Sequence, residues 1–265
     1  MKNYHKDYEY LSKSFLQQFS ISPAHAKHYM ENPPDTDAMR FGRIYHAMIA
    51  GAVSEFALFD PAQRPELDKT FGSKLNKEWK ETFILAAEKN GIDICTIEEH
   101  EQITSMISKL RDNEVVQQIN AFDLVQEEAF RTEIDGYKVK CKPDGLQIHR
   151  GTNKENLVID WKTCTSVHPD KIRYDMIKYG YDVQAALYTD IISETNGGES
   201  NFMFIFQEKT EPYDVLPVLV MSYSEMMKDG RNKWRNYYIQ ARKCFETGVW
   251  PGVADQFKEK CLIIE

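Results

Sequence analysis

A short apolar run that ends in two opposite charges constrains the fold of this chain more than any other feature. Residues 157–162 read Leu-Val-Ile-Asp-Trp-Lys, and the apolar part predicts a buried strand. Because alternate residues of a strand point to the same face, Asp160 and Lys162 should project side by side. Charges at the edge of a buried strand are costly to desolvate, so this pair requires partners or a metal ion.

A second carboxylate, Asp144, follows Pro143 upstream of this strand. Mg²⁺ and Mn²⁺ prefer carboxylate, carbonyl and water oxygens, which Asp144, Asp160 and the backbone carbonyl of Trp161 can supply. Lys162 could then orient or help to deprotonate an attacking water, or offset the charge that develops on a phosphate. The alternative interpretation is structural, with two aspartates in surface turns and an ordinary ion pair across strands.

The residues before this strand predict a β-hairpin. Asp135-Gly136 is a strong hairpin-turn signal between two strands in residues 123–148. Lysines alternate with apolar residues on the second strand, and their face is either a stripe that contacts DNA or an ordinary solvated face. These lysines are Lys138, Lys140 and Lys142.

After the charged strand, the pattern predicts a helix at roughly 170–194 and then two strands. A final helix is expected to begin at a capping box formed by Ser222 and Glu225 and to end at Gly248. Strands flanked by helices indicate an α/β (α+β) core, which we place in residues 123–265 together with the C-terminal helix.

The N-terminal part, residues 1–122, is expected to be mainly helical. Ser22-Pro23 predicts a helix start, and a second helix is expected at about 37–51. Residues 53–122 carry few strand signals and are interpreted as a helical insertion. Repeats and long linkers are lacking, so residues 1–265 are expected to form a single domain.

Composition excludes several classes of protein. The apolar runs are too short for a membrane span and the first residues do not resemble a signal peptide, so a cytoplasmic location is expected. The five cysteines are scattered and show no C-x-x-C pair, which argues against disulfide and zinc frameworks. The net charge of −8 argues mildly against a protein that coats nucleic acid through bulk positive charge, but it does not exclude a nuclease, because phosphate contacts need only a local basic cluster.

Three motifs together resemble a known superfamily. Pro143-Asp144 followed by Asp160-Trp161-Lys162 resembles the PD-(D/E)XK nucleases. Gly42 to His46 is similar to the G-x-x-x-H element of RecB-like nucleases, and Gln184 to Tyr188 to their Q-x-x-x-Y element. The opening from residue 11 resembles RecE-type phage and prophage exonucleases. The resemblance implies a restriction-endonuclease-like core, in which helices flank a central mixed β-sheet, with a helical N-terminal region and insertion.

The resemblance also implies roles for individual residues. His46, Asp144, Asp160 and the Trp161 carbonyl would bind the metal ion, with Glu128 as an additional acidic ligand and Glu127 as the competing assignment. The catalytic set would comprise Asp144, Asp160, Lys162, Gln184 and Tyr188, the last two lining the site and contacting DNA or positioning Lys162. The basic residues that flank the motifs are candidate phosphate contacts: Arg40, Arg43, Lys171, Arg173 and Lys178.

The implied activity is a metal-dependent DNA exonuclease that uses Mg²⁺, with Mn²⁺ as a substitute. It would act 5′-to-3′ on linear double-stranded DNA and leave 3′ single-stranded tails for recombination. A single-strand annealing recombinase and a ring-shaped homo-oligomer are the implied partners. Two alternatives compete with this activity: an endonuclease of the same fold that serves restriction or repair, and a non-cleaving DNA-binding module on a degenerate nuclease fold.

Overall fold

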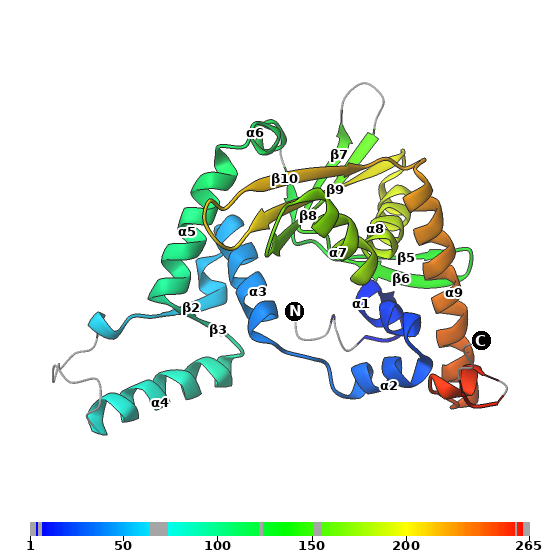
Figure 1. The fold of residues 1–265 in the computed structure, drawn as a ribbon, viewed down its shortest axis with the longest axis horizontal. Helices are drawn as coiled ribbons and strands as arrows, with labels where there is room; N and C mark the ends of the chain where they lie inside the picture. The colour runs from blue at the N-terminus through cyan, green and yellow to red at the C-terminus, as the bar shows by residue number, and fades with distance from the viewer. Residues whose placement is uncertain are drawn as a thin grey trace.

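A five-stranded mixed sheet lies at the centre of the molecule (Figure 1). The computed structural model describes residues 4, 7–63, 74–121, 124–150, 155–257 and 259–261. The strands in spatial order are β10 (Val215–Val220), β9 (Ser200–Glu208), β8 (Glu155–Cys164), β7 (Gly145–Arg150) and β4 (Val125–Gln126). β8 and β9 run parallel and the other neighbours antiparallel, which confirms the predicted mixed sheet flanked by helices.

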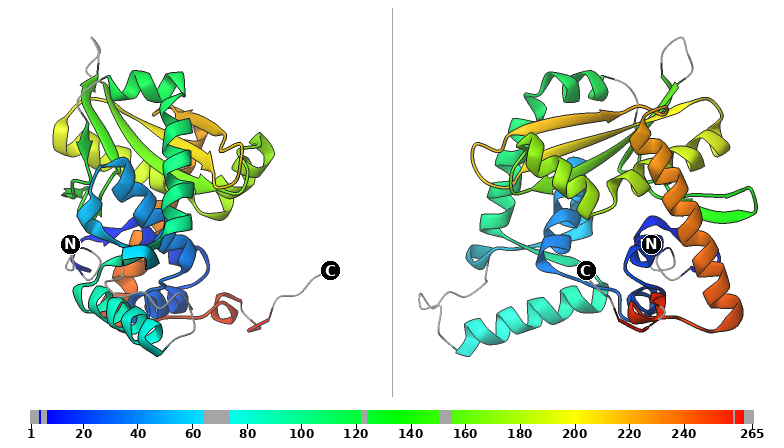
Figure 2. Two further views of the ribbon diagram at one scale, coloured as in Figure 1. Left: turned by 90° about the vertical axis from the view of Figure 1, so that its left-hand side faces the viewer. Right: turned by 45° about the vertical axis from the view of Figure 1, so that its right-hand side comes forward.

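The central strand β8 forms where its apolar run predicted it. Val158 points to one side, where α8 (Tyr181–Asn196) covers the sheet. Ile159 and Trp161 point to the other side, which α3 (Asp37–Ile49) and α5 (Ile97–Arg111) cover. Helices therefore cover both faces of the sheet at β8, as Figures 1 and 2 show from three directions.

The predicted hairpin is confirmed and belongs to a second sheet. Its strands are β5 (Phe130–Ile134) and β6 (Tyr137–Cys141), and the parallel strand β1 (Leu11–Ser12) pairs with β6. Asp135 and Gly136 have φ angles of 51° and 83°, the positive values that a type I′ turn requires.

The face with alternating lysines is neither a free DNA-facing stripe nor an ordinary solvated face. Lys140 is 1% exposed and donates hydrogen bonds to the backbone carbonyls of Tyr4 and Asp7. Lys138 pairs with Glu9, and Lys142 pairs with Glu127. The N-terminal segment covers this face because β1 joins the sheet beside β6, a long-range pairing without a local signal in the sequence.

The N-terminal helices begin near the predicted positions. The chain forms α1 (Lys13–Leu16) and η1 (Gln17–Ser20), followed by α2 (Pro23–Glu31). The hydroxyl oxygen of Ser22 accepts a hydrogen bond from the backbone N–H of His25, so Ser22 caps α2 as expected.

The insertion at 53–122 is helical but also contains two strands that were not predicted. Its helical segments are η2 (Val53–Glu55), η3 (Pro61–Gln63), α4 (Lys74–Asn90), α5 and α6 (Glu114–Asn120). The strands β2 (Phe56–Phe59) and β3 (Asp93–Thr96) pair in parallel. They are short and far apart in sequence, so no turn signal marks their pairing.

The helix predicted at roughly 170–194 is two helices, α7 (Pro169–Lys178) and α8. They are separated at Gly180, whose φ of 60° lies in the left-handed region. The last helix, α9 (Glu225–Thr247), packs against α8 and is followed by η4 (Ala254–Gln256).

The predicted start of α9 is wrong. The cap is Ser224, whose side-chain oxygen accepts from the Met227 N–H, whereas the Ser222 hydroxyl donates to the Glu199 carboxylate. Gly248 ends the helix with a φ of 71°, as expected. Among the helices that the structure describes, none combines the length and the apolar character needed to span a membrane.

Candidate active site

Residues from α3, β8 and the connection before β7 meet at one end of the central sheet. A ring nitrogen of His46, Nε2, lies 3.0 Å from the backbone carbonyl oxygen of Trp161, and Nδ1 lies 3.4 Å from Asp144 Oδ1. The other Asp144 oxygen accepts a hydrogen bond of 2.8 Å from the Trp161 N–H. Three of the predicted metal ligands, far apart in sequence, therefore lie in contact.

A carboxylate from the end of β4 completes this group. Ligand atoms of His46, Glu127 and Asp144 all lie within 4.8 Å of one another. The prediction favoured Glu128, which is exposed and absent from the group, so the alternative assignment, Glu127, fits the geometry instead. The reason is local backbone geometry, because β4 ends at Gln126 and Glu127 adopts a left-handed φ of 53°, which interrupts the alternation of a strand.

The Asp160–Lys162 pair lies beside this group on the face of β8 that α8 covers. The Asp160 Oδ2 atom is 2.5 Å from Lys162 Nζ, and Oδ1 accepts a hydrogen bond of 2.6 Å from Gln184 Nε2. Oδ1 thus has a hydrogen bond, whereas Oδ2 is buried with an ion-pair partner but no hydrogen bond among the described residues. Asp160 is not a member of the three-residue donor group.

The two predicted residues of α8 differ in their contacts. The side-chain bond of Gln184 goes to Asp160, so Gln184 orients this carboxylate rather than Lys162. The Tyr188 ring packs one turn later on Phe202, with ring centroids 6.2 Å apart. Burial raises the pKa of Tyr188 well above its usual value, so its hydroxyl stays protonated at neutral pH.

The pKa values of Asp144 and Lys162 are both raised, but for different reasons. Burial raises the pKa of Asp144 to about 6, although the neighbouring His46 acts in the opposite direction. Burial would lower the pKa of Lys162, but Asp160, Tyr181 and Asp144 together outweigh this effect, and the pKa is raised. Lys162 therefore keeps its proton at neutral pH, which suits charge stabilisation better than proton abstraction.

A second lysine near the site was not predicted. Lys13 Nζ donates a hydrogen bond of 2.7 Å to the Tyr179 carbonyl oxygen and lies 5.7 Å from the Tyr181 ring centroid. Lys162 Nζ is 5.4 Å from the centroid of the same ring. Burial and the proximity of Lys162 lower the pKa of Lys13 to about 7. The only signal in the sequence is its place in the segment that resembles RecE-type exonucleases.

Most of the predicted phosphate contacts are already paired within the protein. The guanidinium of Arg40 binds Glu99, and that of Arg43 binds Asp93 and Asp35. Lys171 pairs with Asp175 and Arg173 with Asp170, all four on α7. Lys178 has no ion pair among the described residues and lies over the rings of Tyr174 and Tyr179. Of the five, Lys178 is the strongest candidate for a phosphate contact.

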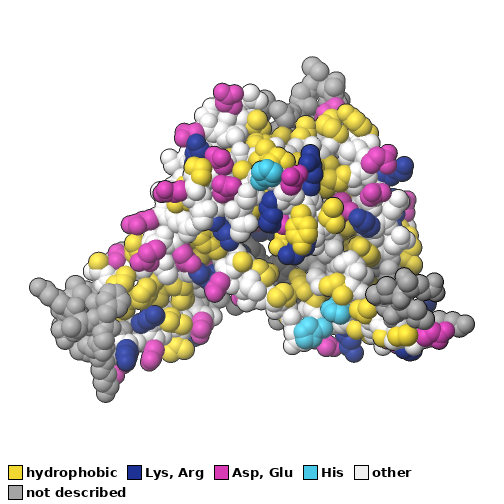
Figure 3. Space-filling model, viewed as in Figure 1, with side chains coloured by type: hydrophobic (Ala, Val, Ile, Leu, Met, Phe, Trp, Pro, Cys, Tyr) yellow, Lys and Arg dark blue, Asp and Glu magenta, His cyan; other side chains and the backbone are white. Residues whose placement is uncertain are grey.

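The surface view agrees with a site that attracts an anion. Several Lys and Arg side chains, interspersed with hydrophobic and acidic ones, lie near a hollow at the centre of the face in Figure 3, between the places of α3 and α7 in Figure 1. A local basic rim of this kind can attract a polyanion even though the chain carries a net charge of −8.

Comparisons with known proteins identify the family and the fold of this chain. The family model described as a PDDEXK-like domain of unknown function (DUF3799) matches residues 12–261. A crystal structure named "Putative exonuclease", from Eubacterium rectale, is similar with a TM-score of 0.60 and 12% identity, covering 97% of this chain and 90% of that one. At this identity the likeness shows the fold alone.

A phage-related exonuclease from Haemophilus somnus 129PT matches with a TM-score of 0.32 and 13% identity, over 88% of this chain and 95% of that chain. This score is too low to support an argument. No curated protein matches the sequence.

Proposed function

The chain belongs to the DUF3799 family of PDDEXK-like domains, and from this premise we propose that it is a metal-dependent exodeoxyribonuclease. The observation that carries the proposal is the donor group of His46, Glu127 and Asp144 beside the Asp160–Lys162 pair. Two carboxylates and an imidazole converge there, next to the partly exposed ammonium of Lys162, which can face a phosphate. A structural ion pair alone would not require the other donors.

The donor chemistry fits a hard divalent cation. Carboxylate oxygens and the Trp161 carbonyl suit Mg²⁺ and Mn²⁺, and an imidazole such as His46 is better tolerated by Mn²⁺. His46, Glu127 and Asp144 would hold the ion, with Asp160 adjoining them through β8. A bound divalent ion polarises a phosphoryl oxygen and makes water a better nucleophile.

The protein's own residues position and stabilise the reacting groups. Asp160 and Lys162 lie side by side, so the ammonium can orient a water molecule and offset the charge that develops on the phosphate. Gln184 fixes the Asp160 carboxylate through one oxygen and leaves the other for Lys162. The Trp161 N–H holds Asp144 in the same way, which keeps its second oxygen directed toward His46.

We infer that the substrate is a linear DNA duplex, cleaved 5′-to-3′ to leave 3′ single-stranded tails for recombination. The resemblance of the N-terminal segment to RecE-type enzymes supports this polarity. A ring-shaped homo-oligomer, a single-strand annealing partner and a cytoplasmic location complete the proposal.

The test compares linear duplex DNA with a covalently closed circle of the same sequence. With Mg²⁺ present, an end-dependent enzyme should degrade the linear form and leave the circle intact, because only the linear form has ends. Gel electrophoresis of both forms over time measures the outcome. Cleavage of the circle would instead favour an endonuclease, and cleavage of neither form would favour a DNA-binding module.

Metal binding should depend on pH because the Asp144 carboxyl must lose its proton to bind a cation. Its pKa is raised to about 6, so below this pH the bound proton competes with the metal. The apparent affinity for Mn²⁺ should increase roughly tenfold per pH unit toward pH 6 and level off above it. Calorimetric titration between pH 5 and 7.5, in buffers with different ionisation enthalpies, measures the affinity and the released proton. An affinity that is constant over this range contradicts the assignment of Asp144.

A further inference from the structure

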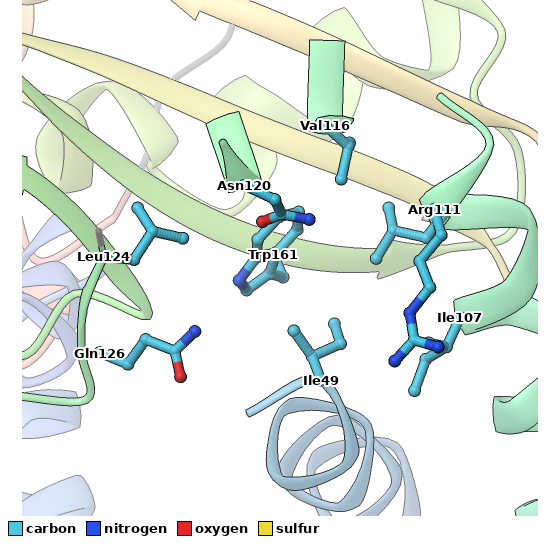
Figure 4. A pocket seen from close by; sticks show the side chains of 9 residues that line it. Ile49, Ile107, Arg111, Val116, Asn120, Leu124, Gln126 and Trp161 are labelled. Carbon is cyan, nitrogen blue, oxygen red and sulfur yellow. The ribbon is translucent and has the colours of Figure 1, made fainter. Parts of the chain in front are cut away.

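A cavity of about 440 Å³ lies on the opposite side of β8 from Asp160 and Lys162 (Figure 4). Its walls come from α3, α5, α6, β4 and β8. Six of the nine lining residues are apolar, among them Ile49, Val116 and Leu124, and Trp161 projects into the cavity from β8. Because side chains alternate along a strand, Trp161 faces this cavity while its two neighbours face α8.

The cavity adjoins the donor group through three connections along the chain. The Trp161 carbonyl contacts His46, while the Trp161 side chain lines the cavity. Gln126, another lining residue, directly precedes Glu127. Ile49 follows His46 on α3 by three residues, which is a rise of about 4.5 Å along the helix. A nucleotide held at the donor group would therefore have this cavity within reach of its base.

Several polar groups at the cavity lack a partner in the protein. The guanidinium of Arg111 and the side-chain amides of Asn120 and Gln126 make no hydrogen bond to any residue that the structure describes. The same is true of the indole N–H of Trp161 within the described part of the chain. Figure 4 shows these groups around one open space. Their donors and acceptors are thus available to a ligand.

We propose that this cavity receives a nucleobase of the DNA strand whose phosphate lies at the donor group. The proposal rests on the proposed function and extends it to a second subsite. A base has flat apolar faces that suit the aliphatic walls, and a polar edge that amides recognise through paired donor and acceptor groups. Trp161 is 5% exposed, so it offers its edge and N–H rather than a face for stacking. Arg111 at the rim can contact a neighbouring phosphate.

Other occupants fit the lining less well. A lipid or an apolar peptide side chain would match the apolar residues of the lining but would make no use of the two amides and the guanidinium. A phosphate alone would pair with Arg111 but would not use the apolar walls. A nucleotide can contact both the apolar residues and the polar side chains of the cavity. Under the proposed function, its phosphate lies at the adjoining donor group.

The test measures DNA binding without cleavage and removes one base at a time. The protein carries Lys162→Met so that the DNA remains intact, and Mg²⁺ is present. Duplexes carry a single abasic residue at successive positions from the 5′ end, and fluorescence anisotropy measures affinity. One position should show a loss of roughly tenfold, because only one base occupies the cavity.

Pocket variants show whether that base lies in the cavity. In the Asn120→Ala/Gln126→Ala protein, the abasic duplex at the sensitive position should bind as well as the intact duplex, since the interaction is already lost. Gln118→Ala is the matched control, because Gln118 is an exposed amide on α6 that does not line the cavity. This control should keep the full sensitivity to the abasic position.

Two results would overturn the inference while leaving the nuclease assignment intact. One is an equal affinity for every abasic position, and the other is a sensitivity that persists in the double variant. Failure to bind any duplex, by a protein that folds normally, would overturn the proposed function and the base subsite together.

Discussion

Replacing Lys162 with methionine should reduce the cleavage of linear duplex DNA by at least about 10²- to 10³-fold. The ammonium lies 2.5 Å from Asp160 Oδ2 on a side chain that is 22% exposed, so solvent or another cation replaces it poorly. Methionine keeps most of the aliphatic stem and removes only the charge. The rate is measured at saturating Mg²⁺, so that a change in metal affinity does not contribute.

The matched control for this variant is Lys178→Met, which removes an exposed lysine of α7 that has no described ion pair. Its effect should be confined to DNA affinity. Breaking a buried ion pair also destabilises a protein, so the melting temperature of each variant is measured. Adding Asp160→Asn to Lys162→Met should restore stability but not activity. Full activity of the folded Lys162 variant would refute the site.

A single methyl group at Gly230 should produce the largest loss of stability. A Cβ atom there would lie 2.1 Å from the Asp182 carbonyl oxygen and 2.8 Å from the Ala186 Cβ, on the neighbouring helix α8. Such distances force α8 and α9 apart, so Gly230→Ala should lower the free energy of unfolding by about 3 kcal/mol. For a protein of this size the melting temperature should fall by roughly 5 °C or more.

Gly42 provides a matched control within a helix. A Cβ atom at this position of α3 would meet nothing within 4 Å. Gly42→Ala should therefore raise the free energy of unfolding by about 0.5–1 kcal/mol, because alanine favours the helix. Calorimetric melting of both variants checks the pair. Equal effects of the two substitutions would contradict the close packing of α8 and α9.

The parts of the fold that the sequence predicts are those with local signals. The apolar run before Asp160 predicts β8, and Asp135-Gly136 predicts the hairpin turn, because a type I′ turn requires positive φ angles. Ser22 and Gly248 mark helix ends for equally local reasons. Each of these signals lies within a few residues of the structure that it specifies.

The remainder depends on contacts between distant segments. β1 joins β6 and β2 joins β3 without a turn between them, so periodicity cannot reveal either pair. The burial of Lys140 and the position of Lys13 both follow from that placement of the N-terminal segment. Choosing between two consecutive acidic residues required the φ angle of Glu127, which no propensity scale supplies.

In the candidate site, too, some contacts follow from local sequence signals and others from the meeting of distant segments. Strand alternation predicts that Asp160 and Lys162 are neighbours, and they are. Nothing local predicts that His46 lies on the Trp161 carbonyl, and only the resemblance to nuclease motifs suggested that these residues meet. Gln184 donates a hydrogen bond to Asp160, and this bond could not be inferred from spacing along a helix.

The alternation of side chains along β8 has a consequence for how such a protein can evolve. Trp161 contributes only backbone atoms to the His46 and Asp144 contacts, while its side chain belongs to the opposite face. Mutation can therefore vary that side chain, and with it the lining of the cavity, without altering the carboxylate and ammonium on either side. An inserted or deleted residue in β8 would move the side chains beyond it to the opposite faces of the sheet. The Asp160–Lys162 pair and the cavity wall at Trp161 would then be lost together. Selection should accordingly tolerate substitutions at this position far better than changes in the length of the strand.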